Sequence, residues 1–318
     1  MRCTGNLLVR YPRASSAVPS LPLCRGLSAP LGRTCWEQAS CDTGETTMWH
    51  SNRTVSKDKI RQLDLETRVR VEAQITDARA MALDFTHFAN LDTRLTAYAA
   101  HCAWRRYLFD WLGPVHEKVL LDIACGYSMT PAMFALAGAD VYAVDVAPQT
   151  IATVQRFAES KGVADHVHLH VGPIERLPFE SAQFDLIYGG AALHHLQLDR
   201  AGSELARVLK RGGKGAFQDP LGHNLLFEFA RDYLPYKGKH PVKGTDHPLR
   251  VHEIVAFGRH FGTCTYRGFE LFSVAAKPLH LKRSSRLRHI LESIDRLALD
   301  RIPYLQRYAR YVVTSVTK

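Results

Sequence analysis

The sequence contains no run of about 20 apolar residues, and it therefore predicts no membrane-spanning helix. Its seven cysteines form no CxxC pair, which leaves a zinc ribbon or a thioredoxin-like site without support. They are also too few and too irregularly spaced for a disulfide framework, so we expect a reducing compartment. With 46% hydrophobic and 23% charged residues over 318 positions, the chain has the composition of a soluble globular protein.

Acidic residues are missing from the N-terminal segment before Glu37, which is rich in Ser, Pro, Arg and Gly. This composition is that of an organelle transit peptide, although Pro12 would interrupt an amphipathic helix early. The alternative is that translation begins at Met48. Under either reading we exclude residues 1–47 from the fold as a disordered or targeting segment. We expect the protein in the cytoplasm, or in mitochondria if the segment is a transit peptide.

Positive charge is concentrated toward the C-terminus. The net charge is +10, and from Arg250 onward roughly thirteen Lys and Arg stand against five Asp and Glu. Such a stretch attracts nucleic acid, anionic lipid or an acidic substrate, or is simply a solvated helix face. Apolar residues at helical spacing from Leu287 to Leu297 form one face between these charges. That face predicts a helix packed on the sheet, a lid over an acceptor pocket or a weak contact with a membrane surface.

Short apolar runs alternate with helical stretches along the central part of the chain. A helical region from Lys57 to Leu112 comes first. The strands expected after it are Lys118–Ile123, Asp140–Val146, Val167–Val171, Phe184–Tyr188, Gly215–Gln218, Phe269–Ala275 and Tyr311–Val316. The alternation predicts a mostly parallel sheet with helices on both faces and with ligands bound beyond the carboxyl ends of its strands.

Small residues follow the first expected strand, where the chain reads Leu121-Asp122-Ile123-Ala124-Cys125-Gly126-Tyr127-Ser128. Small side chains allow the backbone to approach a ligand closely. Asp145 ends the second strand, where a carboxylate can accept hydrogen bonds from both hydroxyls of a ribose. The competing role for Asp145 is to cap the following helix. The dinucleotide fingerprint Gly-x-Gly-x-x-Gly is absent, because Ala124 and Met129 stand at two of its glycine positions.

Four blocks together resemble the class I S-adenosylmethionine-dependent methyltransferases, specifically the group that acts on small molecules and lipids. They read VLLDIACGYS, VYAVDVAP, RLPFESAQFDLIYGGAALHHL and ARVLKRGGKGAFQDP, and they lie in order between Trp104 and Pro220. The resemblance implies a Rossmann-like sheet of seven strands with an antiparallel last strand. It also implies that S-adenosyl-L-methionine is the cofactor.

The resemblance assigns roles to individual residues. It implies that Asp122 and Gly126 lie by the methionine moiety and that Asp145 holds the ribose. The segment Gly172–Glu175 would line the adenine, and Gly189–His194 would close over the sulfonium end. The expected cofactor-binding residues are Asp122, Ala124, Gly126, Asp145, Val146, Ile174, Glu175 and Ala191.

The chain departs from the family pattern at three positions. Ala124 and Ser128 replace two glycines of the loop, a change that preserves close approach unless a positive φ is required. Pro173 stands where the family commonly has an Asp that binds the adenine amino group, so Ile174 or Glu175 must hold adenine instead. These departures keep open a non-catalytic binding or regulatory relative with a weakened cofactor site.

Histidines are the expected general bases if the acceptor is a hydroxyl group. The candidates are His194, after the fourth strand, and His223 and His247, after the fifth. Asp246 could orient such a base, or join His223 and His247 as metal ligands. We expect no metal site.

The expected organisation has an N-terminal helical cap at residues 48–114 and a methyltransferase domain at residues 115–318. Residues 221–265 and 278–308 would cover the substrate. The sequence predicts methyl transfer, at oxygen, to a small-molecule or lipid-like acceptor and not to nucleic acid, and it leaves the oligomeric state open.

Overall fold

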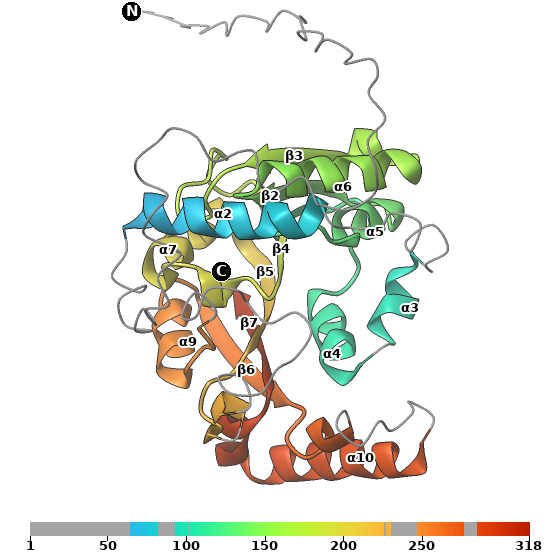
Figure 1. Ribbon diagram of the computed structural model, residues 1–318, viewed down its shortest axis with the longest axis vertical. Coiled ribbons are helices and arrows are strands. Elements are labelled where there is room, and N and C mark those ends of the chain that lie inside the picture. The colour runs from blue at the N-terminus through green and yellow to red at the C-terminus, as the bar shows by residue number, and fades with distance from the viewer. Residues whose placement is uncertain (1–63, 82–92, 101, 226, 230–246, 277–284) are drawn as a thin grey trace, which may run out of the picture. The chain divides into compact units, whose positions relative to one another are not determined.

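A mixed sheet of seven strands forms the core of the part of the chain that the structure describes (Figure 1). The computed structural model describes residues 64–81, 93–100, 102–225, 227–229, 247–276 and 285–318. The strand order is β3-β2-β1-β4-β5-β7-β6. The strands are β1 (Val119–Ile123), β2 (Asp140–Asp145), β3 (Val167–Val171), β4 (Phe184–Gly190), β5 (Leu209–Pro220), β6 (Thr263–Phe269) and β7 (Tyr311–Thr317). Strands β1 to β5 pair in parallel, and β7 runs antiparallel to both of its neighbours, so the predicted fold class is confirmed.

Apolar alternation within the strands builds a core on each face of the sheet. In β1, Leu120 packs with residues of α4, α5 and α6, whereas Leu121 and Ile123 pack with residues of α7 and α9. The longer helices are α2 (Leu65–Met81), α4 (Ala103–Leu112), α5 (Thr130–Leu136), α6 (Pro148–Ser160), α7 (Leu198–Val208), α9 (Val251–Gly258) and α10 (Arg286–Arg301). The shorter helices are α3 (Leu95–Ala99), η3 (Ala164–His166), η4 (Leu193–His195), η5 (Ser273–Ala276) and η6 (Pro303–Tyr308). No described helix is both long and apolar enough to cross a membrane.

Helix α2 is attached to the sheet domain through Asp77, which caps the N-terminus of helix α6. The Asp77 carboxylate accepts hydrogen bonds from the backbone N–H groups of Gln149 (2.8 Å) and Thr150 (3.2 Å) in the first turn of α6. These N–H groups have no partner within a helix, and a carboxylate also interacts favourably with the positive end of the helix dipole. Asp77 therefore holds α2 across the carboxyl edge of β1 and β2, where Figure 1 shows it in blue.

The sixth strand was placed too late by the sequence prediction. It was expected at Phe269–Ala275, but β6 ends at Phe269 and a 3-10 turn, η5, follows. The buried Asp295 carboxylate of α10 accepts hydrogen bonds from the backbone N–H groups of Leu271 (3.1 Å), Phe272 (2.6 Å) and Ser273 (3.2 Å). Because these donors are satisfied by a side chain, the chain leaves the sheet after Phe269.

Replacing Asp295 with alanine is expected to lower the free energy of unfolding by about 2–3 kcal/mol, because three backbone donors lose a charged acceptor. Urea unfolding followed by circular dichroism measures the change. Asp300→Ala on the same helix is the control, since Asp300 makes a surface ion pair with Arg267 and should cost about 1 kcal/mol or less. Equal losses in the two variants would contradict the role assigned to Asp295.

Several predictions fall on residues outside those that the structure describes. These are the targeting segment at 1–47, the first part of the helical cap, and Asp246. Residues 54–318 form one unit by their internal contacts, and the helices before β1 belong to it.

Candidate cofactor site

A cavity of about 700 Å³ lies at the carboxyl ends of β1, β2 and β4, beneath α2. This volume falls in the range of pockets that bind small ligands. Seven of the eight predicted cofactor-binding residues line it: Ala124, Gly126, Asp145, Val146, Ile174, Glu175 and Ala191. The eighth, Asp122, lies outside the lining.

The loop after β1 approaches the cavity with two residues in the left-handed region. Ala124 has φ = 46° and Gly126 has φ = 56°. Gly126 adopts a positive φ without a steric penalty because it has no Cβ. The Cβ of Ala124 makes the same conformation unfavourable by about 1–2 kcal/mol. Ser128, at the other altered glycine position, does not have a positive φ, and its hydroxyl lies 2.7 Å from that of Thr130. The substitution at Ser128 is therefore tolerated, while the one at Ala124 strains the loop.

Ala124→Gly is expected to raise the free energy of unfolding by about 0.5–1 kcal/mol. Glycine removes the strain of the left-handed conformation at this position. This gain exceeds the free-energy cost of the larger conformational entropy that glycine has in the unfolded chain. Denaturant titration of the full chain measures it, and Ala132→Gly, inside α5, is the control that should destabilise. A loss of stability in Ala124→Gly would show that the loop is not strained at this position.

Asp145 is held in place by two backbone donors. Its Oδ2 accepts a hydrogen bond from Gly126 N (2.9 Å), and its Oδ1 accepts one from Ala147 N (3.0 Å). Burial raises the pKa of Asp145, and the two backbone hydrogen bonds act in the opposite direction. Each carboxylate oxygen can accept a further hydrogen bond, so Asp145 retains capacity for a ligand in the cavity. The cap on α6 is supplied by Asp77 instead.

Asp122 lies beneath the loop rather than at the cavity surface. Its Oδ2 accepts a hydrogen bond from the hydroxyl of Thr130 (2.7 Å), and its Oδ1 is buried without a partner among the described residues. Burial raises the pKa of Asp122 to about 8. A carboxyl group in this state fastens the first turn of α5 to β1.

The two residues expected to hold adenine differ in how much of their side chains is available to a ligand. Ile174 is buried and presents only part of its side chain to the cavity. Glu175 accepts a hydrogen bond from Gln197 N (2.8 Å) through Oε1, so one of its oxygens already fixes the loop before α7. Pro173 does not line the cavity.

None of the three predicted catalytic histidines lines this cavity. The ring of His194 is buried, with Nδ1 2.8 Å from Asp219 Oδ1, and burial raises the pKa of Asp219 to about 8. His223 and His247 lie near the start of α9 instead. His223 accepts a hydrogen bond from Val251 N (3.0 Å) through Nε2, and burial is the main cause that lowers its pKa.

His247 also lies near the start of α9, and it is one of the three residues considered as metal ligands. Its Nε2 lies 3.5 Å from Glu253 Oε2. Asp246, the third member of the expected cluster, is outside the described residues. Among the residues that the structure describes, no group of three or more His, Cys, Asp or Glu side chains could hold a metal ion.

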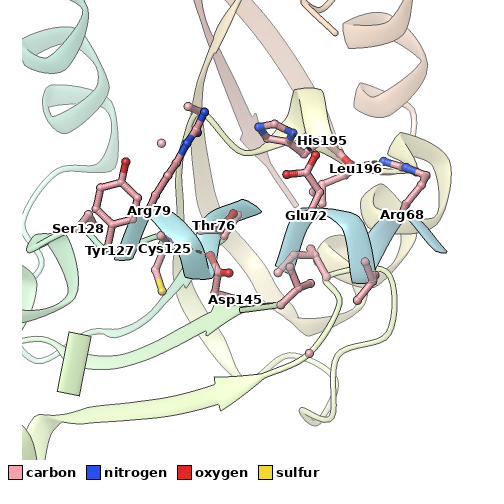
Figure 2. Close-up of a pocket in the computed structure, with 18 of the residues that line it drawn as sticks. Arg68, Glu72, Thr76, Arg79, Cys125, Tyr127, Ser128, Asp145, His195 and Leu196 are labelled. Carbon is pink, nitrogen blue, oxygen red and sulfur yellow. Dashed lines mark hydrogen bonds and ion pairs between the residues drawn. The ribbon is translucent and has the colours of Figure 1, made fainter. Parts of the chain in front are cut away.

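His195, the neighbour of the predicted base His194, lines the cavity. Its Nδ1 lies 3.3 Å from Glu72 Oε1 of α2, and its backbone carbonyl accepts a hydrogen bond from Arg68, also of α2. Figure 2 shows Glu72 and His195 turned toward one another above Asp145. No sequence motif marks Glu72, because the pair joins segments more than 120 residues apart.

Arg105 is a second cavity residue without a sequence signal. Its guanidinium lies over the ring of Tyr98, 3.9 Å from the ring centroid. Its Nε is buried and has no hydrogen-bond partner among the described residues. An unsatisfied buried donor on a cation is a site for an anionic group.

The sheet order and the lining of this cavity agree with the resemblance to class I S-adenosylmethionine-dependent methyltransferases. Residues 121–217 match the family model described as a methyltransferase domain, and S-adenosylmethionine is the cofactor of that family. The predicted resemblance is thereby confirmed for this part of the chain.

Known proteins resemble the chain over the same part. It is 30% identical to sterol 4-C-methyltransferase strm-1 of Caenorhabditis elegans over 33% of this chain and 31% of that protein. It is 30% identical to sarcosine/dimethylglycine N-methyltransferase of Aphanothece halophytica over 34% of this chain and 39% of that protein. The geranyl diphosphate C-methyltransferase structure from Streptomyces coelicolor A3(2) aligns with 17% identity and a TM-score of 0.47, over 70% and 77% of the two chains. The chain thus spans well under two thirds of these curated relatives.

Proposed function

We propose that this protein is an S-adenosylmethionine-dependent methyltransferase that methylates a small-molecule or lipid-like acceptor at oxygen. The observation that carries the proposal is the convergence of Asp145, the Gly126 loop and Ala191 on one cavity. Methyl transfer requires chiefly that the acceptor atom be aligned with the methyl carbon, and a cavity closed by α2 provides that restraint.

The residues of the cavity fit the proposed cofactor. The free acceptor capacity of Asp145 suits two ribose hydroxyls, and the unsatisfied Nε of Arg105 suits the methionine carboxylate. Ile174 and Glu175 would lie against adenine. When bound, S-adenosylmethionine supplies an electrophilic methyl group on a sulfonium sulfur.

We assign the general base to His195, with Glu72 as the residue that positions it. Glu72 Oε1 lies at ion-pair distance from Nδ1 rather than in hydrogen-bond geometry. A negative charge on this side favours the tautomer protonated on Nδ1, which leaves a lone pair on Nε2 for a proton from the acceptor. This assignment replaces His194, whose buried ring faces Asp219. The relatives above are named for transfer to carbon and to nitrogen, so transfer to oxygen rests on the His195 pair alone.

Two measurements on the full chain test the proposal. Calorimetry with S-adenosylmethionine and S-adenosylhomocysteine tests the cofactor, and micromolar binding is expected. Release of S-adenosylhomocysteine is then followed with a sterol, a naphthoquinone, sarcosine and a set of phenols. Turnover with phenols alone supports transfer to oxygen, and turnover with sarcosine alone would refute it. Binding without turnover of any acceptor would favour the non-catalytic alternative.

A further inference from the structure

Helix α10 carries four of its apolar side chains outward. Leu287, Ile290, Ile294 and Leu297 are 47%, 54%, 45% and 59% exposed. Their spacing of three and four residues places them on one side of the helix, which we call the outer stripe. The sequence pattern favoured a helix that packs this side on the sheet, whereas these four side chains are exposed in the structure.

Polar groups occupy the inward side of the same helix. Asp295 is buried against the loop after β6, and Arg288 and Glu292 form an ion pair of 2.9 Å. These three side chains line a second cavity of about 530 Å³ between α4, β6 and α10. Because the buried carboxylate fixes the orientation of α10, the outer stripe cannot turn inward without losing these hydrogen bonds.

Exposed apolar surface continues past the end of α10. Ile302 is 51% exposed and Tyr304 is 60% exposed. Exposed apolar side chains at this spacing are typical of a contact with another protein or with a membrane.

The charges around the outer stripe decide between these partners. Arg286 and Arg301 are exposed on α10, and no ion pair involves them among the described residues. The only exposed acidic residue of the helix, Asp300, is paired with Arg267. A symmetric contact between two copies would bring arginines against arginines, which is unfavourable. An apolar face bordered by arginines is the pattern of a helix lying on an anionic bilayer.

We propose that the outer stripe of α10 docks the protein on an anionic lipid surface, with the apolar side chains in the headgroup boundary and the arginines on lipid phosphates. This surface is distinct from the cofactor cavity, so the inference does not depend on the proposed methyl transfer.

Flotation of the full chain with two kinds of vesicle tests the inference. One kind is phosphatidylcholine alone, and the other also contains phosphatidylglycerol. The wild type is expected to bind the second kind and to be released by salt. The double variant Ile290→Glu/Leu297→Glu should bind about tenfold or more weakly. Arg286→Gln/Arg301→Gln should lose about tenfold to thirtyfold on the anionic vesicles alone.

Matched controls separate this contact from misfolding and from self-association. Val255→Glu changes a side chain of α9 that is 50% exposed and should leave flotation unchanged. All variants should keep the wild-type affinity for S-adenosylmethionine. The inference is overturned if the wild type binds neither vesicle, or if the Glu variant binds like the wild type. It is also overturned if sedimentation velocity shows a wild-type dimer that the Glu variant dissociates.

Discussion

Asp145→Ala is expected to weaken the binding of S-adenosylmethionine by roughly 30-fold to 5,000-fold. Two charge-assisted hydrogen bonds to the ribose account for about 2–5 kcal/mol of binding free energy. The variant also removes the acceptor for Gly126 N and Ala147 N, which loosens the loop that forms the cavity floor. Isothermal titration calorimetry with the full chain measures the change.

A second variant separates the charge of Asp145 from its shape. Asp145→Asn keeps an oxygen for one of the two backbone donors but carries no charge. We expect it to bind S-adenosylmethionine with an affinity between those of the wild type and Asp145→Ala. Asp140→Ala, at the start of the same strand, is half-buried outside the cavity and should bind normally. Wild-type affinity in Asp145→Ala would exclude the ribose role and leave Asp145 as a support for the loop.

The sheet could be predicted because each strand is marked by a short apolar run in its own sequence. The runs of β1 and β2 are mostly buried and are bounded by turns, and the small residues after β1 mark the edge of the sheet where a ligand is expected. The end of β6 could not be predicted in this way. It depends on Asp295, which lies more than 20 residues away and supplies the acceptor that a neighbouring strand would otherwise provide.

The same distinction applies to the site. Asp145 is recognisable because its position at a strand end is local information. The choice between His194 and His195 is not local, since the buried Asp219 of β5 contacts one ring and Glu72 of α2 lies against the other. The outward face of α10 could not be foreseen either. An amphipathic pattern shows that a helix has an apolar side, but not which side meets the protein.

The two adjacent histidines should respond to the same substitution in opposite ways. His195→Asn is expected to lower kcat by about 10²-fold to 10⁴-fold, because the acceptor loses its general base, with little change in affinity for S-adenosylmethionine. His194→Asn should instead lower the melting temperature, because it leaves the buried Asp219 without its ring partner, while the folded fraction keeps its specific activity.

Glu72→Gln completes the comparison, since it keeps the shape of the side chain and removes the charge beside Nδ1 of His195. We expect the acidic limb of the kcat profile to shift to lower pH, because the carboxylate stabilises the protonated imidazole and its removal lowers the pKa of His195. The measurement is S-adenosylhomocysteine release against pH, with an acceptor identified in the screen above. A profile that keeps its acidic limb in His195→Asn would exclude His195 as the titrating base. Equal effects on kcat of the two histidine substitutions would leave the pair with a structural role only.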